Sequence, residues 1–474
     1  MREGAARWEA SAARRPRERL RSLLALAWPI VVSRSSQVVV GIADAVMVAH
    51  LGAAALAATT AGAMNAFTVF ILPMGIVFVV SSFSSQLFGM GDLGGARRYA
   101  WYGLAVAGAT QALALVLVPL VPAALAPFSF APDVRALMEG YLSIRLLSAG
   151  PVVGIEALGN YYGGLGNTRP QMRASVAAML LAVAGNWILI DGHLGAPALG
   201  VRGSALANTI GTTAAFLGLF AVFVRSGRRL GTGPLRASEL LRLLRFGVPS
   251  GLNWFFEFLA FAFFMNVVVA GLGTTPLAAL MAVLQVNSVA FMPAFGIASA
   301  GAILVGQAIG ASRKEAVPGI VGLSFAVAGA WQALVGLVYL AAPDLVLAAF
   351  ARDPASAHEL LEVGRRMLLL SVGWQLFDAA ATVLAESLRA AGDTAFTLFA
   401  RLAIAWAVFA PGSWVSVRVL GGGDVAAVAW LVAYLALLAL VLLLRFRSGA
   451  WRHILLVEPS PIAPREPAER AARR

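Results

Sequence analysis

Cysteine is absent from the 474 residues, and charged residues make up only 12% of the chain. The first absence excludes disulfides, thiolate metal sites and cysteine nucleophiles. The second excludes an ordinary soluble domain, in which about 25% of residues are charged. With 60% hydrophobic residues and a mean hydropathy of +0.82, the sequence indicates a protein that crosses a lipid bilayer many times.

Catalytic and nucleotide-binding motifs are also lacking. The chain has four histidines, and it contains no HExxH, GxSxG or GxxxxGK[ST] pattern. We therefore expect no enzymatic activity and no cofactor, and we expect an ion gradient to drive any transport. The net charge of +13 does not indicate nucleic-acid binding, because the arginines lie between apolar runs and at the two ends.

Twelve apolar runs are long enough to cross a bilayer, which takes about 20 helical residues. The predicted spans are 23–48, 57–86, 100–120, 141–162, 171–190, 203–224, 248–271, 277–306, 320–342, 367–388, 397–417 and 425–443. The basic loops alternate with loops of little charge, so the positive-inside rule places both termini in the cytoplasm. The arginines of 352–366 are the exception, and their interleaved acids predict a short external amphipathic helix there.

The two halves of the chain repeat short motifs in the same order. Residues 86–89 (QLFG) are matched by 307–310 (QAIG) at a shift of 221, and 166–168 (GNT) by 392–394 (GDT) at a shift of 226. Six spans per half is an even number, so both halves start on the same side of the membrane. The repeat therefore predicts a pseudo-twofold axis along the membrane normal.

The predicted fold is an all-α integral membrane protein with twelve transmembrane helices in two pseudo-symmetric six-helix bundles. Its expected parts, in chain order, are a basic cytoplasmic tail (1–22), the first bundle (23–224), a basic cytoplasmic linker (225–247), the second bundle (248–446) and a cytoplasmic tail (447–474).

Charged side chains inside predicted spans are candidates for function, because a charge in lipid is expensive. Asp44, Glu257 and Asp378 are the strongest candidates. Each could hold a proton, a metal cation or an organic cation, or could instead be a structural polar contact. Two further groups have other expected roles: Arg34, Arg145 and Glu156 as structural partners, and Glu386, Arg389 and Arg401 as charges near the cytoplasmic ends that reach the interface.

Two amides and a proline complete the set of candidates. Asn186 and Asn208 lie in spans five and six, where they could face Asp44 and coordinate a cation or hold its proton. A buried asparagine can equally be a contact between helices. Pro29 interrupts the first span, frees a carbonyl and permits a hinge.

From residue 23 to residue 446 the chain resembles the multidrug and toxic compound extrusion (MATE) family, and within it the NorM-like members. The resemblance rests on the duplication and on the order of these residues: Pro29, Gln37, Asp44, Met47, the turn 166–170, Asn186, Trp187, Phe256, Glu257, Gln375 and Asp378.

The resemblance implies a secondary antiporter of the cell inner membrane, which exports drug-like organic cations by alternating access while H⁺ or Na⁺ flows inward. It implies coupling at Asp44, Asn186, Asn208, Glu257 and Asp378, with Na⁺ as a possible ligand of Asp44 or of Glu257 and Asp378. The substrate cavity is expected to include Gln37, Phe256, Trp374 and Gln375. The expected partners are the lipid bilayer and the organic cation, and a monomer is expected.

Two departures from the family pattern weaken the case for sodium as the coupling ion: Ala182 stands where an asparagine is common, and Trp374 where a tyrosine is frequent. Trp374 lies one helical turn before Asp378, so its ring is expected on the same face. A flippase for lipid-linked or polysaccharide precursors, from the same wider superfamily, is the alternative function. The acidic rather than arginine-lined spans weigh against it.

Overall fold

The computed structural model describes residues 16–128, 130–227, 233–348, 350 and 357–457. This part of the chain is helical and contains no strand, and eleven of its helices are long and apolar enough to cross a membrane. Ten of them lie mainly within α2 (Pro16–Ala49), α3 (Ala53–Met90), α4 (Leu93–Leu117), α8 (Arg169–Asp191), α9 (Val201–Gly227), α10 (Ala237–Phe263), α11 (Thr274–Gly310), α12 (Val317–Ala341), α14 (Ala357–Ala390) and α17 (Gly423–Arg447). The eleventh, Thr394–Val419, begins with α15 (Thr394–Ala403) and continues through α16 (Ala410–Trp414).

A bent pair of helices supplies the twelfth span. α6 (Pro132–Leu146) and α7 (Ala149–Gly164) meet at an angle of 46°, at the place of the fourth predicted span. The short helices α5 (Val121–Leu125), α13 (Pro343–Leu347) and α16 (Ala410–Trp414) extend or connect spans. The all-α fold with up to twelve spans is confirmed.

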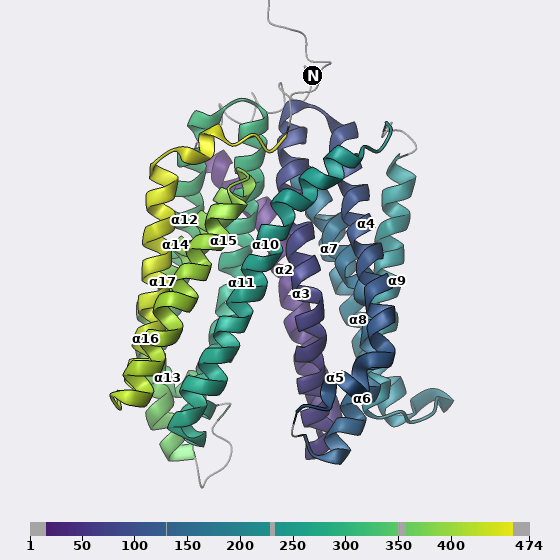
Figure 1. Cartoon of the computed structure of the whole chain (residues 1–474), viewed down its shortest axis with the longest axis vertical. Helices are drawn as coiled ribbons and strands as arrows, with labels where there is room; N and C mark the ends of the chain where they lie inside the picture. Colours follow the sequence, from purple (N-terminus) through teal and green to yellow (C-terminus); the bar gives the residue numbers. More distant parts are fainter. Residues whose placement is uncertain (1–15, 129, 228–232, 349, 351–356, 458–474) are drawn as a thin grey trace, which may run out of the picture.

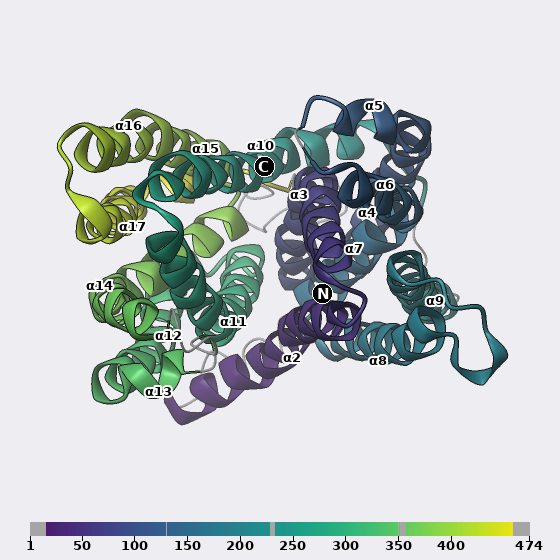
Figure 2. The same cartoon turned by 90° about the horizontal axis from the view of Figure 1, so that it is seen from below.

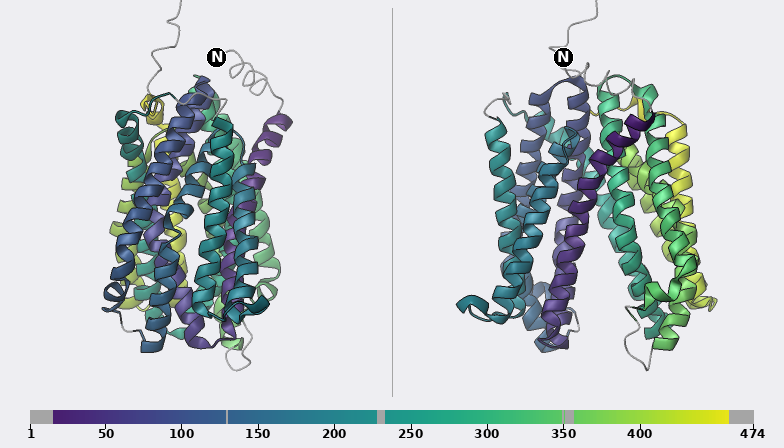
Figure 3. Two further views of the ribbon diagram at one scale, coloured as in Figure 1. Left: turned by 90° about the vertical axis from the view of Figure 1, so that its right-hand side faces the viewer. Right: turned by 180° about the vertical axis from the view of Figure 1, so that it is seen from behind.

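The helices form two bundles, α2–α9 and α10–α17, which we call the N bundle and the C bundle. They converge at the face where both ends of the described chain lie, here called the N face, and diverge toward the opposite face (Figure 1, Figure 3). α3 and α11 are the innermost helices, since 72% and 67% of their apolar windows are buried. Each runs beside the bundle interface.

Two helices cross from one bundle to the other. α2 packs on both α8 and α11, and α10 packs on both α3 and α15. Figure 2 shows α2 extending from beside α8 toward α11. The crossings need glycine, because a Cβ on Gly75 would lie 2.6 Å from Gly251 Cα, and one on Gly296 would lie 2.5 Å from Val31 Cγ2. Pro29 and Pro249 lie inside the crossing helices, next to these contacts.

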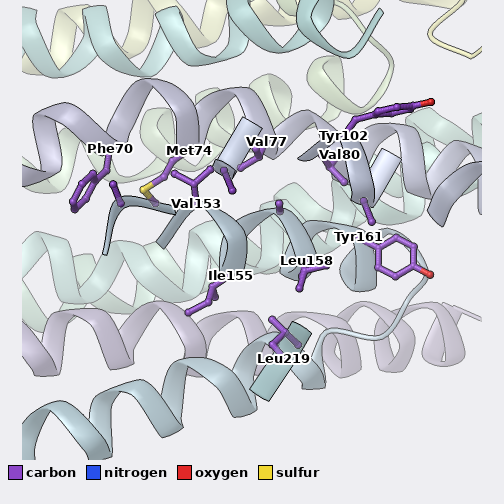
Figure 4. Packing of buried hydrophobic residues seen from close by; sticks show 14 of the residues in the cluster. Phe70, Met74, Val77, Val80, Tyr102, Val153, Ile155, Leu158, Tyr161 and Leu219 are labelled. Atoms are coloured by element: carbon purple, nitrogen blue, oxygen red, sulfur yellow. The ribbon is translucent and has the colours of Figure 1, made fainter. Parts of the chain in front are cut away.

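Each bundle has its own apolar core. In the N bundle, α3 and α7 interdigitate through Met74, Val77, Val153 and Leu158, which are nearly inaccessible to solvent (Figure 4). The C bundle holds separate clusters around α11 and α14. The crossing helices enter the core of the opposite bundle, since Leu23, Ala27 and Ile30 of α2 lie in a C-bundle cluster and Leu243 of α10 lies in the N-bundle cluster.

At the N face the bundles are joined by two hydrogen bonds that the repeat relates. Gln86 Nε2 donates to the Ala390 carbonyl at 2.8 Å, and Gln307 Nε2 donates to the Gly164 carbonyl at 3.0 Å. The two glutamines are 221 residues apart and their acceptors 226 apart, which are the shifts found in the sequence. All four groups are buried, so the N face is closed between the bundles.

The segment after α17 also spans both bundles at the N face. Trp451 is buried in the core of the C bundle, whereas Leu456 and Val457 are buried in that of the N bundle. Figure 1 shows this yellow segment running from α17 toward α3. Part of the stretch expected as a tail is therefore packed.

The predicted external amphipathic helix at 352–366 is wrong for the residues that the structure describes. Residues 351–356 lie outside them, and from Ala357 the chain is already the start of α14. Arg365 and Arg366 lie in this helix, 3.9 Å from Asp344 and 3.4 Å from Asp424 respectively. The charged first turns of α14 thus continue directly into its membrane span, and acids of neighbouring segments lie close to the two arginines.

Replacing both Gln86 and Gln307 by leucine should open the N face. Each buried hydrogen bond contributes about 1 kcal/mol, so the ratio of closed to open molecules should fall roughly thirtyfold. Spin labels on Arg173→Cys and Arg447→Cys, the only cysteines present, would measure the separation of the bundles. Gln111→Leu, which removes contacts to Leu146 and Gly150 within one bundle, is the control. An unchanged distance distribution in the double variant would refute the role of the two glutamines.

Candidate functional site

Asp44 lies in α2 with 7% of its surface exposed, and two asparagines hold its carboxylate. Asn186 Nδ2 of α8 donates to Oδ1 at 2.5 Å, and Asn208 Nδ2 of α9 donates to Oδ2 at 2.8 Å. The expectation that both amides face Asp44 is confirmed. Each carboxylate oxygen therefore has one neutral donor.

Small residues place the two asparagines. α8 and α9 approach so closely that a Cβ on Gly185 would lie 2.8 Å from the Ala207 Cβ. Because Gly185 precedes Asn186 and Ala207 precedes Asn208, the contact brings both amides to the same level beside α2. Ala182, where the family pattern commonly has an asparagine, lines the cavity beside Asp44 and offers no further side-chain oxygen.

The cavity beside Asp44 has a volume of about 310 Å³. Gln37 lines it, as expected for a substrate contact, together with Tyr141, Arg145 and Glu156. Arg145 exerts an attractive Coulomb interaction on Asp44. Sequence reasoning considered Arg145 only as a structural partner, because the bend between α6 and α7 that brings it to Asp44 has no signal in the hydropathy.

Glu156 and Arg34 form a bidentate ion pair across the N bundle, with Nη1 to Oε1 at 2.8 Å and Nη2 to Oε2 at 2.9 Å. The guanidinium also lies 5.2 Å from the Phe78 ring centre and 5.7 Å from that of Phe295, which belongs to the C bundle. The expected structural pairing of Arg34 with Glu156 is confirmed. It neutralises two charges next to the bundle interface.

In the C bundle, Glu257 of α10 forms an ion pair with Arg401 of α15. Both line a cavity of about 260 Å³ that also contains Asp378 of α14. Glu257 and Asp378 thus share one cavity, as the sequence suggested. Electrostatic interaction links Asp378 to both Glu257 and Arg401.

The prediction that Glu386, Arg389 and Arg401 reach the membrane interface is wrong. All three line the C-bundle cavity, and Glu386 and Arg389 form a buried ion pair. Arg389 also donates to the Phe78 carbonyl of the N bundle at 2.9 Å. Long basic side chains can reach water from a helix end, but here an acid within the protein offers a closer partner.

Of the three remaining candidates for the substrate cavity, one lies in a crevice beside charged residues and two are buried. Phe256 lies in a crevice beside Glu257 and Arg401. Trp374 is buried in the apolar core of the C bundle and is not among the residues that line the cavity of Asp378, contrary to the expectation that its ring covers that face. Gln375 is also buried, and its Nε2 donates to Asn287 Oδ1 at 2.5 Å.

Within the described residues, no three His, Asp or Glu side chains gather in a way that could hold a metal ion. In the two cavities, Glu156, Glu257 and Glu386 each pair with an arginine instead. Both cavities have aromatic walls, Tyr141, Phe67 and Phe70 in one and Trp254, Phe291 and Phe295 in the other. Such cavities suit an apolar ligand with a small number of charges.

Two duplicated six-span bundles, with an acidic cavity in each, define a polytopic membrane transporter of the two-bundle class. The chain belongs to the MatE family: the sequence profile of that family matches residues 29–188 and again residues 249–415, once in each half. The family resemblance inferred from the sequence is thereby confirmed.

Relatives of similar length align over most of the chain. The chain is 30% identical over 423 residues to a probable multidrug resistance protein NorM of Pseudomonas putida, which covers 86% of this chain and 90% of the relative. It is also 30% identical over 441 residues to a probable multidrug resistance protein NorM of Caulobacter vibrioides, with 91% and 92% covered.

Solved structures show the same fold. A MOP superfamily transporter from Pyrococcus furiosus superposes with a TM-score of 0.82 at 19% identity, over 92% of this chain and 97% of the other. A multidrug resistance MATE family transporter in an outward-facing conformation superposes with a TM-score of 0.81 at 19% identity, over 92% and 97%.

Removing Glu156 alone should destabilise the N bundle more than removing its ion pair altogether. Glu156→Leu leaves the Arg34 guanidinium without its carboxylate, at a cost of about 3 kcal/mol, whereas Arg34→Met with Glu156→Leu removes both charges. Thermal unfolding in detergent, followed by tryptophan fluorescence, would compare the variants.

Asp344→Asn provides the control for that comparison, because it breaks a pair whose side chains are 62% and 57% exposed and should change stability by less than about 1 kcal/mol. A double variant at Arg34 and Glu156 that unfolds at the same temperature as Glu156→Leu would contradict the interpretation.

Proposed function

We propose that this protein is a secondary antiporter of the bacterial inner membrane, which exports drug-like organic cations in exchange for inward-moving protons. The observation that carries the proposal is Asp44, a carboxylate held by two neutral amides beside a cavity within the membrane span. The names of the NorM relatives support drugs as substrates.

The orientation follows from the distribution of arginine. Arg97, Arg98, Arg169, Arg313 and Arg445 belong to the ends of helices at the N face. By the positive-inside rule the N face is cytoplasmic, and with it both ends of the described chain. The bundles converge at this face and diverge toward the opposite one (Figure 3), which supports an outward-open conformation.

Coupling follows from the electrostatics of a carboxylate in a medium of low dielectric constant. Such a group attracts a proton or an organic cation, and the attraction to a second cation is lost once the first has bound. Proton entry from outside would therefore release the substrate. The return to the inward-open state would use the crossing helices α2 and α10, with Pro29 and Pro249 as hinges.

The surroundings of Asp44 support protons over sodium. Both asparagines present their nitrogen donors to the carboxylate, and Ala182 adds no oxygen ligand. A sodium ion needs several oxygen ligands at once, whereas a proton needs only the carboxylate oxygen. Sodium coupling would require both amides to rotate.

The test is efflux from proteoliposomes that contain a fluorescent organic cation, with an imposed proton gradient or an imposed sodium gradient. We expect the proton gradient alone to drive efflux in the wild type. Asp44→Asn keeps the shape and hydrogen bonding of the side chain but cannot titrate, so it should fold, insert and lose gradient-driven efflux.

Asp191→Asn is the matched control, because it makes the same substitution at an exposed acid that pairs with His50 outside the cavity. It should transport like the wild type. Full proton-driven efflux by Asp44→Asn would show that Asp44 is only a structural contact, and efflux driven by sodium alone would identify sodium as the coupling ion.

A further inference from the structure

The C-bundle cavity contains five ionisable side chains, and four of them are already paired. Glu386 pairs with Arg389, and Glu257 pairs with Arg401. Among the residues that the structure describes, Asp378 forms no ion pair and no hydrogen bond, although it lines the same cavity. With every group ionised, the paired charges cancel and the cavity carries one net negative charge, that of Asp378.

The two pairs differ in what they hold together. Arg389 also contacts Phe78 of the other bundle, so the pair with Glu386 belongs to the closed bundle interface. Arg401 of α15 pairs instead with Glu257 of α10, so this pair joins two helices of the C bundle. Its side chain is only 12% exposed, whereas that of Glu257 is 43% exposed.

Arg401 is therefore a cation held inside the protein, and Glu257 is the more exposed partner at the cavity. A guanidinium remains charged at any physiological pH. Separating Arg401 from Glu257 would leave the guanidinium charge unpaired in surroundings of low polarity. The free-energy cost of such an unpaired charge is high. A mobile cation that approached Glu257 would also meet the positive charge of Arg401.

We propose that Arg401 acts as a tethered counter-cation that keeps Glu257 neutralised, so that Asp378 alone exchanges ligands and the C-bundle cavity selects a single positive charge. This inference deepens the proposed function, because it assigns charge selectivity to one of the two cavities. Arg401 is a positioning residue: it acts on the ligand through Glu257 and Asp378.

The other lining residues agree with a monovalent organic cation as the ligand. Trp254, Phe291 and Phe295 line the cavity with Asp378, and aromatic faces attract a flat cation without adding a formal charge. The N bundle is only partly parallel: Arg34 pairs with Glu156, but Arg145 lines the cavity together with Asp44 and attracts it.

The experiment compares ethidium, a monovalent cation, with propidium, a divalent cation that carries the same chromophore. Binding is measured by fluorescence in nanodiscs without any gradient, in an Asp44→Asn background so that only the C-bundle cavity reports. The proteins are this background and its Arg401→Gln, Glu257→Gln and doubly substituted derivatives. Thermal unfolding confirms that each is folded.

Glu257→Gln should weaken ethidium binding at least tenfold, because the unpaired positive charge of Arg401 then neutralises Asp378 and repels the ligand. The double substitution removes both charges and should restore ethidium binding to within about threefold of the background protein. Arg401→Gln exposes two carboxylates and should raise the propidium-to-ethidium preference by about tenfold or more. A purely structural role for Arg401 would not change this preference.

Two results would overturn the inference. If the double variant binds ethidium as weakly as Glu257→Gln, then Glu257 is itself a ligand and is not merely the partner of Arg401. If the background protein binds propidium as well as ethidium, the cavity does not select a single charge. Gradient-driven efflux by the wild type is a separate measurement, so the proposed function can stand or fall independently of this binding assay.

Discussion

The cost of placing a charge among apolar helices is the constraint on which this structure depends. Arginine and glutamate meet that cost by pairing, as in Arg34 with Glu156 and Glu257 with Arg401. Asp44 meets it mainly with two amide donors, together with the attraction of Arg145, which lines the same cavity. Compensation by neutral groups leaves a carboxylate its charge, and with it the capacity to exchange one cation for another. The polar interior is thus divided into charges that are fixed and a small number that are available.

Gene duplication explains how the same chain builds a cavity in each half and one closed face between them. The reciprocal hydrogen bonds of Gln86 and Gln307 follow the shifts of the sequence repeat. The close contacts of Gly75 with Gly251 and of Gly296 with Val31 are related in the same way, at shifts of 221 and 220. The interface therefore combines symmetric contacts with the crossing helices α2 and α10, whose side chains enter the core of the opposite bundle. The segment after α17, through Leu456, adds one contact that the repeat does not supply.

The sequence predicted the architecture well because lipid allows few solutions. Without water to satisfy the backbone, each long apolar run must be helical, and the repeat adds the pseudo-symmetry. Part of the site was predictable too, since an acid such as Asp44 in a span invites a functional explanation and nearby asparagines suggest its partners. The positions of Arg401 and Trp374 were not predictable. Hydropathy shows that a residue lies within a span, but it does not show which neighbour the helix turns it toward.

The sequence by itself determined the membrane class, the helical fold, the duplication and the acids that could act, because composition and the length of apolar runs decide these. Tertiary structure alone decided which acids are compensated by arginine and which are not. A rotation of 100° per residue separates the core face of a helix from its cavity face. Ion pairs such as Glu257 with Arg401 join helices distant in the chain. Their geometry depends on helix packing, and that is where the charges of the cavity are settled.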